Sequence, residues 1–365
     1  MRNRAQRVGT LLSLALAAAL SGPLAAVTAG QDPAVNGTIW VANRSTAVNP
    51  DTVRAFDAAT GDIMHEIQMA TGSQPGDLAV AKGKVYVAEE RGGAPAVAIV
   101  DAVSGEIISR IFTGGGSRPH HVHASRGGNL VAVGLFGTDD VAVIDTHDDV
   151  LIGQWDTNPA NETGRIHAAV FSNDESTIFL ANEAGNQVIA MDPLTGTVFW
   201  RLAVPAVHEL VVTGNQKMLY VSRRGANRLA VVLLDPYVTV EPDQYIDVLE
   251  LGLPDTLRLS ANEQLLTVGL RTSPARLAVV DTRLIQPCTA NGCDSSAVTL
   301  VDLNPGGAAT TLGGHQWTSP GGRYTWASFE GPGAGVALID HHDTNRIVTI
   351  LSYPGQPHGV DHCHP

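Results

Sequence analysis

A repeated pattern of apolar strands and polar turns constrains the fold of this 365-residue chain more than any other feature. In each copy an apolar segment, a polar turn and a second apolar segment end on an aspartate, as in KVYVAEERGGAPAVAIVD. Most of these aspartates begin a turn before another strand, as in DAVSGEIISRI, where Asp caps its own backbone and Gly supplies a positive φ. The seven copies end at Asp57, Asp101, Asp145, Asp192, Asp235, Asp281 and Asp340.

The spacing of the copies identifies the architecture. Successive aspartates are 43 to 47 residues apart, except for a last interval of 59 that also holds the loop CTANGC. One more short segment precedes the copies, such as RPHHVHAS or GRIHAAVFS, which brings each repeat to four strands. Four short strands at this period are typical of a β-propeller. We therefore predict an all-β, seven-bladed propeller with four-stranded antiparallel blades, forming one domain over residues 30–365.

The two ends of the predicted propeller complement each other. The first copy begins at residues 38–43 with the second strand of a blade, and no inner strand precedes it. The C-terminal segment PHGVDHCHP reads as an inner strand that no blade follows. We expect this last strand to complete the first blade and close the ring, which leaves few free sheet edges.

The first 29 residues have the pattern of a secretory signal peptide. Arg2, Arg4 and Arg7 precede the apolar run of residues 11–20, and small residues follow at 27–29. The run is about ten residues long, whereas a membrane-spanning helix needs roughly 20. Loss of this segment would remove three arginines and no acid, and so take the net charge from −13 to −16. We expect a secreted or periplasmic protein without a membrane span.

The acidic excess of the chain narrows the classes of partner that it can bind. Acidic residues outnumber basic ones by 36 to 23, and the chain has no run of lysine or arginine. Nucleic acid and anionic membranes, which attract basic surfaces, are therefore disfavoured. We expect a monomer that binds a small molecule or a protein at the mouth of the central channel.

The three cysteines suit an oxidising compartment. Cys288 and Cys293 bracket a short turn-rich loop, and we predict a disulfide between them. Cys363 is left over within His362-Cys363-His364. It is either an incidental terminal thiol or a metal ligand.

Histidines concentrate in the predicted inner strands. Nine of the 13 fall there, although these segments form about one seventh of the chain and random placement would put about two in them. Alignment of the inner strands on their apolar core residue gives one equivalent position to His120, His167, His208, Asp255 and His358. At this position blade two has Gly76, followed by Asp77, and in blade seven His315 lies one residue away from it.

Equivalent positions of neighbouring inner strands converge at one mouth of the channel, so these imidazoles predict a metal site. Several imidazoles with one carboxylate suit copper or zinc better than calcium or magnesium. A catalytic site without metal, and plain polar lining of a wet channel, both stay open. The predicted ligands are His120, His167, His208, His358 and His315.

Charged residues beside these histidines add further candidates. Arg118 and Arg165 each precede a histidine by two residues and could orient an anionic substrate, or else pair with acidic turn residues. Glu209 and Asp255 are candidates for orienting a ligating imidazole or for acting as a general base.

The repeats, with the pattern VIDxxTGxxIxxI and inner segments of the form xPHxVxxS, resemble the YVTN-type repeats of seven-bladed propellers. Such repeats occur in exported bacterial proteins of the YncE kind and in surface-layer proteins. Similar propellers include lactonases, cytochrome haem domains, copper-dependent nitrous oxide reductases and selenium-binding-type thiol oxidases. The resemblance is thus specific for fold and weak for function. It favours copper over zinc, although the ligand sets of the copper propellers are not matched here.

Three kinds of function therefore stay open. One is a metal-dependent oxidoreductase acting on a small substrate held between metal and arginines. Another is a non-catalytic propeller that binds metal, a protein or a surface polymer. The third is a hydrolase of the lactonase type.

Overall fold

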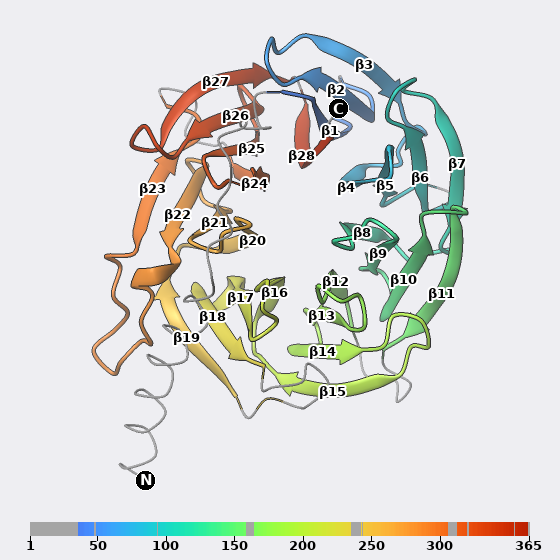
Figure 1. Ribbon diagram of the computed structural model, residues 1–365. Helices are drawn as coiled ribbons and strands as arrows, with labels where there is room; N and C mark the ends of the chain where they lie inside the picture. Colours follow the sequence, from blue (N-terminus) through green and yellow to red (C-terminus); the bar gives the residue numbers. More distant parts are fainter. Residues whose placement is uncertain are drawn as a thin grey trace.

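Seven sheets surround one axis, with their innermost strands nearest to it (Figure 1). The computed structural model describes residues 36–46, 49–92, 94–157, 164–234, 242, 244–305, 312–319, 321–353 and 355–363. The predicted signal peptide and His364 lie outside these residues. Each sheet has four antiparallel strands in sequence order, except that the first begins with the C-terminal strand. The prediction of a seven-bladed propeller is confirmed.

The strands take equivalent places from blade to blade. The innermost strands of blades one to seven are β28 (Gln356–Cys363), β4 (Pro75–Ala81), β8 (Pro119–Ala124), β12 (Ile166–Phe171), β16 (Val207–Val212), β20 (Pro254–Leu259) and β24 (Leu312–Thr318). The second strands are β1 (Thr38–Arg44), β5 (Lys84–Glu89), β9 (Leu130–Leu135), β13 (Ile178–Asn182), β17 (Met218–Arg223), β21 (Leu265–Leu270) and β25 (Tyr324–Glu330).

The outer half of each blade follows the same order. The third strands are β2 (Thr52–Asp57), β6 (Ala96–Asp101), β10 (Asp140–Asp145), β14 (Gln187–Met191), β18 (Arg228–Leu233), β22 (Arg276–Asp281) and β26 (Gly335–Asp340). The outermost strands are β3 (Ile63–Gln68), β7 (Ile107–Phe112), β11 (Val150–Asp156), β15 (Val198–Ala203), β19 (Tyr245–Glu250), β23 (Val298–Asp302) and β27 (Arg346–Ser352). Two short 3₁₀ turns follow β17 and β22, at Arg224–Ala226 and Thr282–Leu284.

The hydrophobic core lies between the blades. The second and third strands are buried on both faces, so they read as nearly continuous apolar runs. Trp40 and Trp326 are fully buried in such inter-blade clusters. The aspartate turns hold the outer strands in place, because Asp101 accepts backbone N–H bonds from Val103 and Ser104. Gly105 in that turn has φ of 72°.

The C-terminal strand closes the ring. β28 pairs antiparallel with β1, with Val360 opposite Val41, and also contacts the inner strands β4 and β24 on either side. The expected completion of the first blade is therefore confirmed, and the inner strands form an unbroken circle. Cys288 and Cys293 form a disulfide in the loop before β23, with Cα atoms 4.2 Å apart. None of the helices among the described residues has the length and hydropathy of a transmembrane segment.

Removal of β28 should abolish the folded monomer. A chain that ends at Tyr353 would expose the inner edge of β1 and lose Val360 from the cluster that contains Trp326. We expect loss of the native circular dichroism spectrum and aggregation on gel filtration. A chain shortened only by residues 364–365 keeps all of β28 and serves as the control. A folded, monomeric protein without β28 would contradict this account of ring closure.

Candidate functional site

A β-bulge recurs near the start of all seven inner strands. In blade three, Pro119 pairs with Leu135 and Val122 with Val133, so that two histidines together face one residue of β9. The register between the inner and second strands shifts at the equivalent place in the other six blades. A bulge redirects the side chains of the residues that it contains. Each blade therefore presents two consecutive bulge residues at the axis.

The first residues of the seven bulges form what we call the outer tier. Its rings make close contacts: His167 lies between His120 and His208, with centroid distances of 4.8 and 3.6 Å. His358 lies 6.3 Å from His120 by the same measure. The outer tier consists of Gly76, His120, His167, His208, Asp255, Gly314 and His358.

The second bulge residues form a deeper inner tier. The rings of His121 and His315, from blades three and seven, stack across the axis with centroids 4.5 Å apart. Glu209 Oε2 of blade five lies 3.1 Å from His121 Nδ1, and Asp77 Oδ1 of blade two lies 3.1 Å from His315 Nδ1. The inner tier consists of Asp77, His121, Ala168, Glu209, Thr256, His315 and Gly359.

A rim of charged residues surrounds the outer tier. Each rim residue lies two positions after the residue of the second strand that faces the bulge, and acids of the rim pair with arginines. The ion pairs Arg44–Glu90 and Arg224–Glu183 span 2.9 and 3.1 Å. The rim consists of Arg44, Glu90, Phe136, Glu183, Arg224, Arg271 and Glu330.

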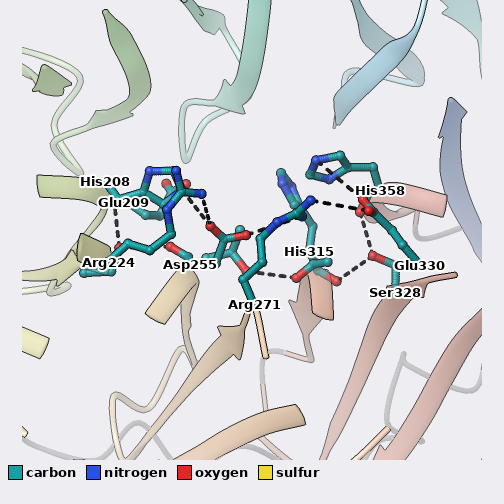
Figure 2. A network of polar contacts seen from close by, with 12 residues as sticks. His208, Glu209, Arg224, Asp255, Arg271, His315, Ser328, Glu330 and His358 are labelled. Carbon is teal, nitrogen blue, oxygen red and sulfur yellow. Dashed lines mark hydrogen bonds and ion pairs between the residues drawn. The ribbon is translucent and has the colours of Figure 1, made fainter. Parts of the chain in front are cut away.

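Asp255 is the centre of the ion-pair network on one side of the mouth (Figure 2). His208 Nε2 lies 2.7 Å from Asp255 Oδ1, which also accepts a bond of 2.8 Å from Arg224. Burial opposes the charge of Asp255, but the bond from His208 and the nearby arginines lower the pKa of this carboxyl well below its usual range. Burial likewise opposes the charge of His208, yet its bonds to Asp255 and Glu183 raise the pKa of the imidazole. Two carboxylates, Asp255 and Glu183, therefore favour the protonated form of His208.

Four other imidazoles of the two tiers lie in surroundings that favour the neutral form. Burial, together with nearby cations and imidazoles, lowers the pKa of His120, His121, His167 and His358 well below its usual value. The Nδ1 atom of each of these rings is buried and has no hydrogen-bond partner among the described residues. Such atoms are ready to accept a proton or to bind a metal ion.

The structure places the two predicted substrate-binding arginines at the mouth. Arg118 forms an ion pair with Glu90 and lies over the ring of Phe136. Arg165 lies against the same ring, 5.3 Å from its centroid, and is exposed. Of the two, Arg165 has the more available guanidinium for a ligand.

The predicted metal ligands separate into different groups. His120 and His167 lie in one compact set of ligand atoms with His121, and His315 lies in a second set with Asp77 and His121. Among the described residues, His208 and His358 belong to neither set. Glu209 is not at the mouth beside His208 but in the inner tier, because consecutive bulge residues occupy different depths. Its place rules out direct contact with a ligand at the rim.

Sequence reasoning missed His121 and Asp77 as members of the site, as well as the whole rim. His121 is the second residue of a bulge, and a strict alternation of strand residues would have placed it away from His120. The sequence does carry a pattern that could have identified the rim: a charged residue at or directly after the end of an apolar second strand. This pattern holds for Glu90, Glu183, Arg224, Arg271 and Glu330.

A separate surface hollow of about 870 Å³ involves Lys84, Asp174 and Glu175 at the other ends of the strands, and no tier residue lines it.

Glu90 should be a strong contributor to stability through the rim. Its buried carboxylate binds both Arg44 and Arg118, and the side chain of Arg44 is only 16% exposed. Glu90→Gln leaves these arginines without their charge partner and should lower the free energy of unfolding by about 3 kcal/mol. The matched control is Glu66→Gln, because the side chain of Glu66 is 41% exposed in its pair with Arg54, and this change should cost less than about 1 kcal/mol. Equal losses for both variants in urea denaturation would contradict the assignment.

Comparisons with known proteins support the fold. The sequence pattern of the family described as lactonase, 7-bladed beta-propeller, matches residues 112–282. No curated protein sequence matches the chain. The solved structure of the periplasmic gluconolactonase of Pseudomonas aeruginosa superposes with a TM-score of 0.65 at 15% identity, covering 90% of this chain and 99% of that one.

A second solved structure carries a different activity on the same architecture. Hydrazine synthase of Kuenenia stuttgartiensis gives a TM-score of 0.64 at 16% identity, covering 92% of this chain and 100% of that one. Identities this low establish the fold and leave the reaction open. The chain is thus a seven-bladed β-propeller whose residues 112–282 are similar to propellers of the lactonase family.

Proposed function

We propose that this propeller hydrolyses lactones at the mouth formed by the outer tier and the rim. One observation carries the proposal: buried imidazoles with unpartnered ring nitrogens lie directly beneath a rim of arginines. The similarity to lactonases supports it, because the matched residues 112–282 include β8, β12, β16 and β20. These four strands carry His120, His167, His208 and Asp255.

The mouth holds the groups that ester hydrolysis requires. Water must lose a proton as it attacks the carbonyl carbon, and an imidazole nitrogen without a partner, as in His120 or His167, can accept that proton. The carbonyl oxygen gains negative charge, which a guanidinium stabilises. The ring C–O bond then breaks, and the alkoxide takes the proton back to give a hydroxy acid. Arg165 is exposed at the mouth and is placed to bind a carboxylate substituent of the lactone.

The rim favours a hydroxylated lactone over an apolar one. Glu183, Arg224, Arg271 and Glu330 present donors and acceptors that can bind sugar hydroxyls, and Phe136 is the apolar member of the rim. We therefore propose lactones of sugar acids as substrates, as the name of the Pseudomonas neighbour indicates for that protein. We also propose that the protein acts outside the cytoplasm. The signal-peptide pattern of residues 1–29 supports this location.

Activity towards a panel of sugar-acid lactones, followed in a pH-stat, tests the proposal. His167→Ala should lower kcat/KM about 10² to 10³-fold, because general-base catalysis contributes about this much. Arg165→Ala should raise KM about tenfold for a lactone that bears a carboxylate and leave a neutral lactone unaffected.

Arg126→Ala is the matched control, because this exposed arginine follows the other end of β8. The control should hydrolyse both lactones like the unchanged protein. Absence of hydrolysis across the panel, or an equal effect of Arg126→Ala and Arg165→Ala, would overturn the proposal.

A transition-metal site at the mouth is the second candidate. The carrying observation is the pair of His120 and His167, whose Nδ1 atoms are buried without partners and which form a compact set with His121. Imidazole donors suit zinc or copper. Elemental analysis of untagged protein should find metal that the double variant His120→Ala/His167→Ala loses while keeping its fold. Unchanged metal content in that variant would exclude the mouth as the metal site.

A further inference from the structure

We propose that the inner tier is a metal site of its own, in which Asp77, His121, Glu209 and His315 bind one divalent transition-metal ion on the axis. This site lies deeper than the mouth and does not depend on lactone hydrolysis. It joins blades two, three, five and seven, none of which contributes more than one ligand.

The carboxylate of Glu209 is the strongest indication of a missing cation. Glu209 is fully buried, and both its oxygens lack a hydrogen bond of acceptable geometry among the described residues. No lysine or arginine of the described chain forms an ion pair with Glu209 or Asp77. An uncompensated buried carboxylate costs several kcal/mol, so a positive charge that offsets it stabilises the fold.

The distances between the donor atoms suit coordination of one ion. His121 Nδ1 lies 3.1 Å from Glu209 Oε2 and 3.5 Å from Asp77 Oδ2. A tetrahedral ion with bonds of about 2.0 Å sets neighbouring ligand atoms about 3.3 Å apart. The ligand atoms of Asp77, His121 and His315 all lie within 4.8 Å of one another, and Glu209 adjoins this set through its contact with His121. His121 Nδ1 and His315 Nε2 are buried without hydrogen-bond partners, as free donors to a metal would be.

Small residues at the remaining inner-tier positions open the space on the axis. Ala168 of blade four lies between the strands that carry His121 and Glu209. Gly359 of blade one is required, since a Cβ there would lie 2.7 Å from the Cα of Asp77. Longer side chains from non-adjacent blades can therefore meet across the ring.

Surrounding groups orient the ligands. The backbone N–H of Val122 donates to Asp77 Oδ2 over 3.1 Å. The ligand Asp77 in turn orients the ligand His315, because Asp77 Oδ1 lies 3.1 Å from His315 Nδ1. His123 Nε2 lies 3.7 Å from the second oxygen of Glu209. Groups beyond the ligands that fix their orientation are typical of real metal sites.

Two imidazoles and two carboxylates favour zinc over calcium or magnesium, which prefer oxygen ligands only. Two carboxylates also offset the charge of a divalent ion. All four positions would be occupied by protein side chains that are 1% exposed or less. A closed coordination shell is typical of structural zinc, so the ion would stabilise the ring by linking blades across the axis.

Metal content after loading tests the site. Full-length untagged protein is incubated with excess ZnCl₂, desalted and analysed by inductively coupled plasma mass spectrometry. We expect at least one zinc per chain in the unchanged protein and one per chain in His120→Ala/His167→Ala, which disables only the mouth. Glu209→Gln should lose the inner-tier ion, and we expect at least a tenfold lower occupancy of that site at limiting zinc. Glu330→Gln makes the same chemical change at the rim and should keep it.

Thermal unfolding gives a second readout, because the midpoint of Glu209→Gln should shift in opposite directions with and without a bound metal. With zinc bound, EDTA should lower the unfolding midpoint of the unchanged protein, and Glu209→Gln should lower it and abolish the EDTA effect. Without a metal, Glu209→Gln removes an unpaired buried charge and should raise the midpoint. If Glu209→Gln does not fold, His315→Ala is measured in its place.

Three results would overturn the proposal. One is unchanged protein that retains no zinc after loading. Another is loss of all zinc from His120→Ala/His167→Ala, which would assign the ion to the mouth. The third is a Glu209→Gln variant that keeps its zinc or unfolds at a higher temperature. Lactone hydrolysis is measured on the same samples, so failure of that activity is seen separately from failure of the metal site.

Discussion

The antiparallel pairing of β28 with β1 is the interaction on which the rest of the structure depends. It joins the two ends of the propeller in one sheet, so the seven inner strands form a closed circle. In a closed circle each inner strand has fixed neighbours on both sides. Equivalent residues of different blades then meet at the axis although they are far apart in the sequence. Asp77 and His315 illustrate this, because they are separated by 238 residues and lie within 3.1 Å.

The bulges place functional side chains at two depths along the axis of this circle. A regular strand would send consecutive residues to opposite faces of the sheet, and only one of His120 and His121 would reach the axis. The bulge in blade three lets both residues reach it, one in the outer tier and one in the inner tier. The same register shift in the other blades explains why a single motif position yields two rings of functional groups. The rim follows from the partner strand, since its residues lie beside the bulge.

The fold could be predicted from the sequence because it rests on periodic features. Strand spacing, aspartate turns and the unpaired terminal segments are all local or repeated, and each agrees with the others. The outer tier could also be predicted in part, because His120, His167, His208, Asp255 and His358 share one alignment position. His121, Asp77 and the depth of Glu209 could not be, because a bulge leaves no periodic mark in a single sequence. The protonation of His208 could not be predicted either, because it depends on contacts with Asp255 of the next blade and with Glu183.

The two tiers differ in how their carboxylates are balanced, and this separates what each can do. At the rim and outer tier, Glu90, Glu183, Asp255 and Glu330 all have arginine partners, so the mouth is charge-compensated without any bound ion. Such a mouth can open to water and exchange ligands at little electrostatic cost. In the inner tier two buried carboxylates lie beside imidazoles and have no arginine or lysine within ion-pair distance among the described residues. A cation from outside the chain would balance them there, and a cation held by four blades would tie the ring together at the depth where the mouth ends.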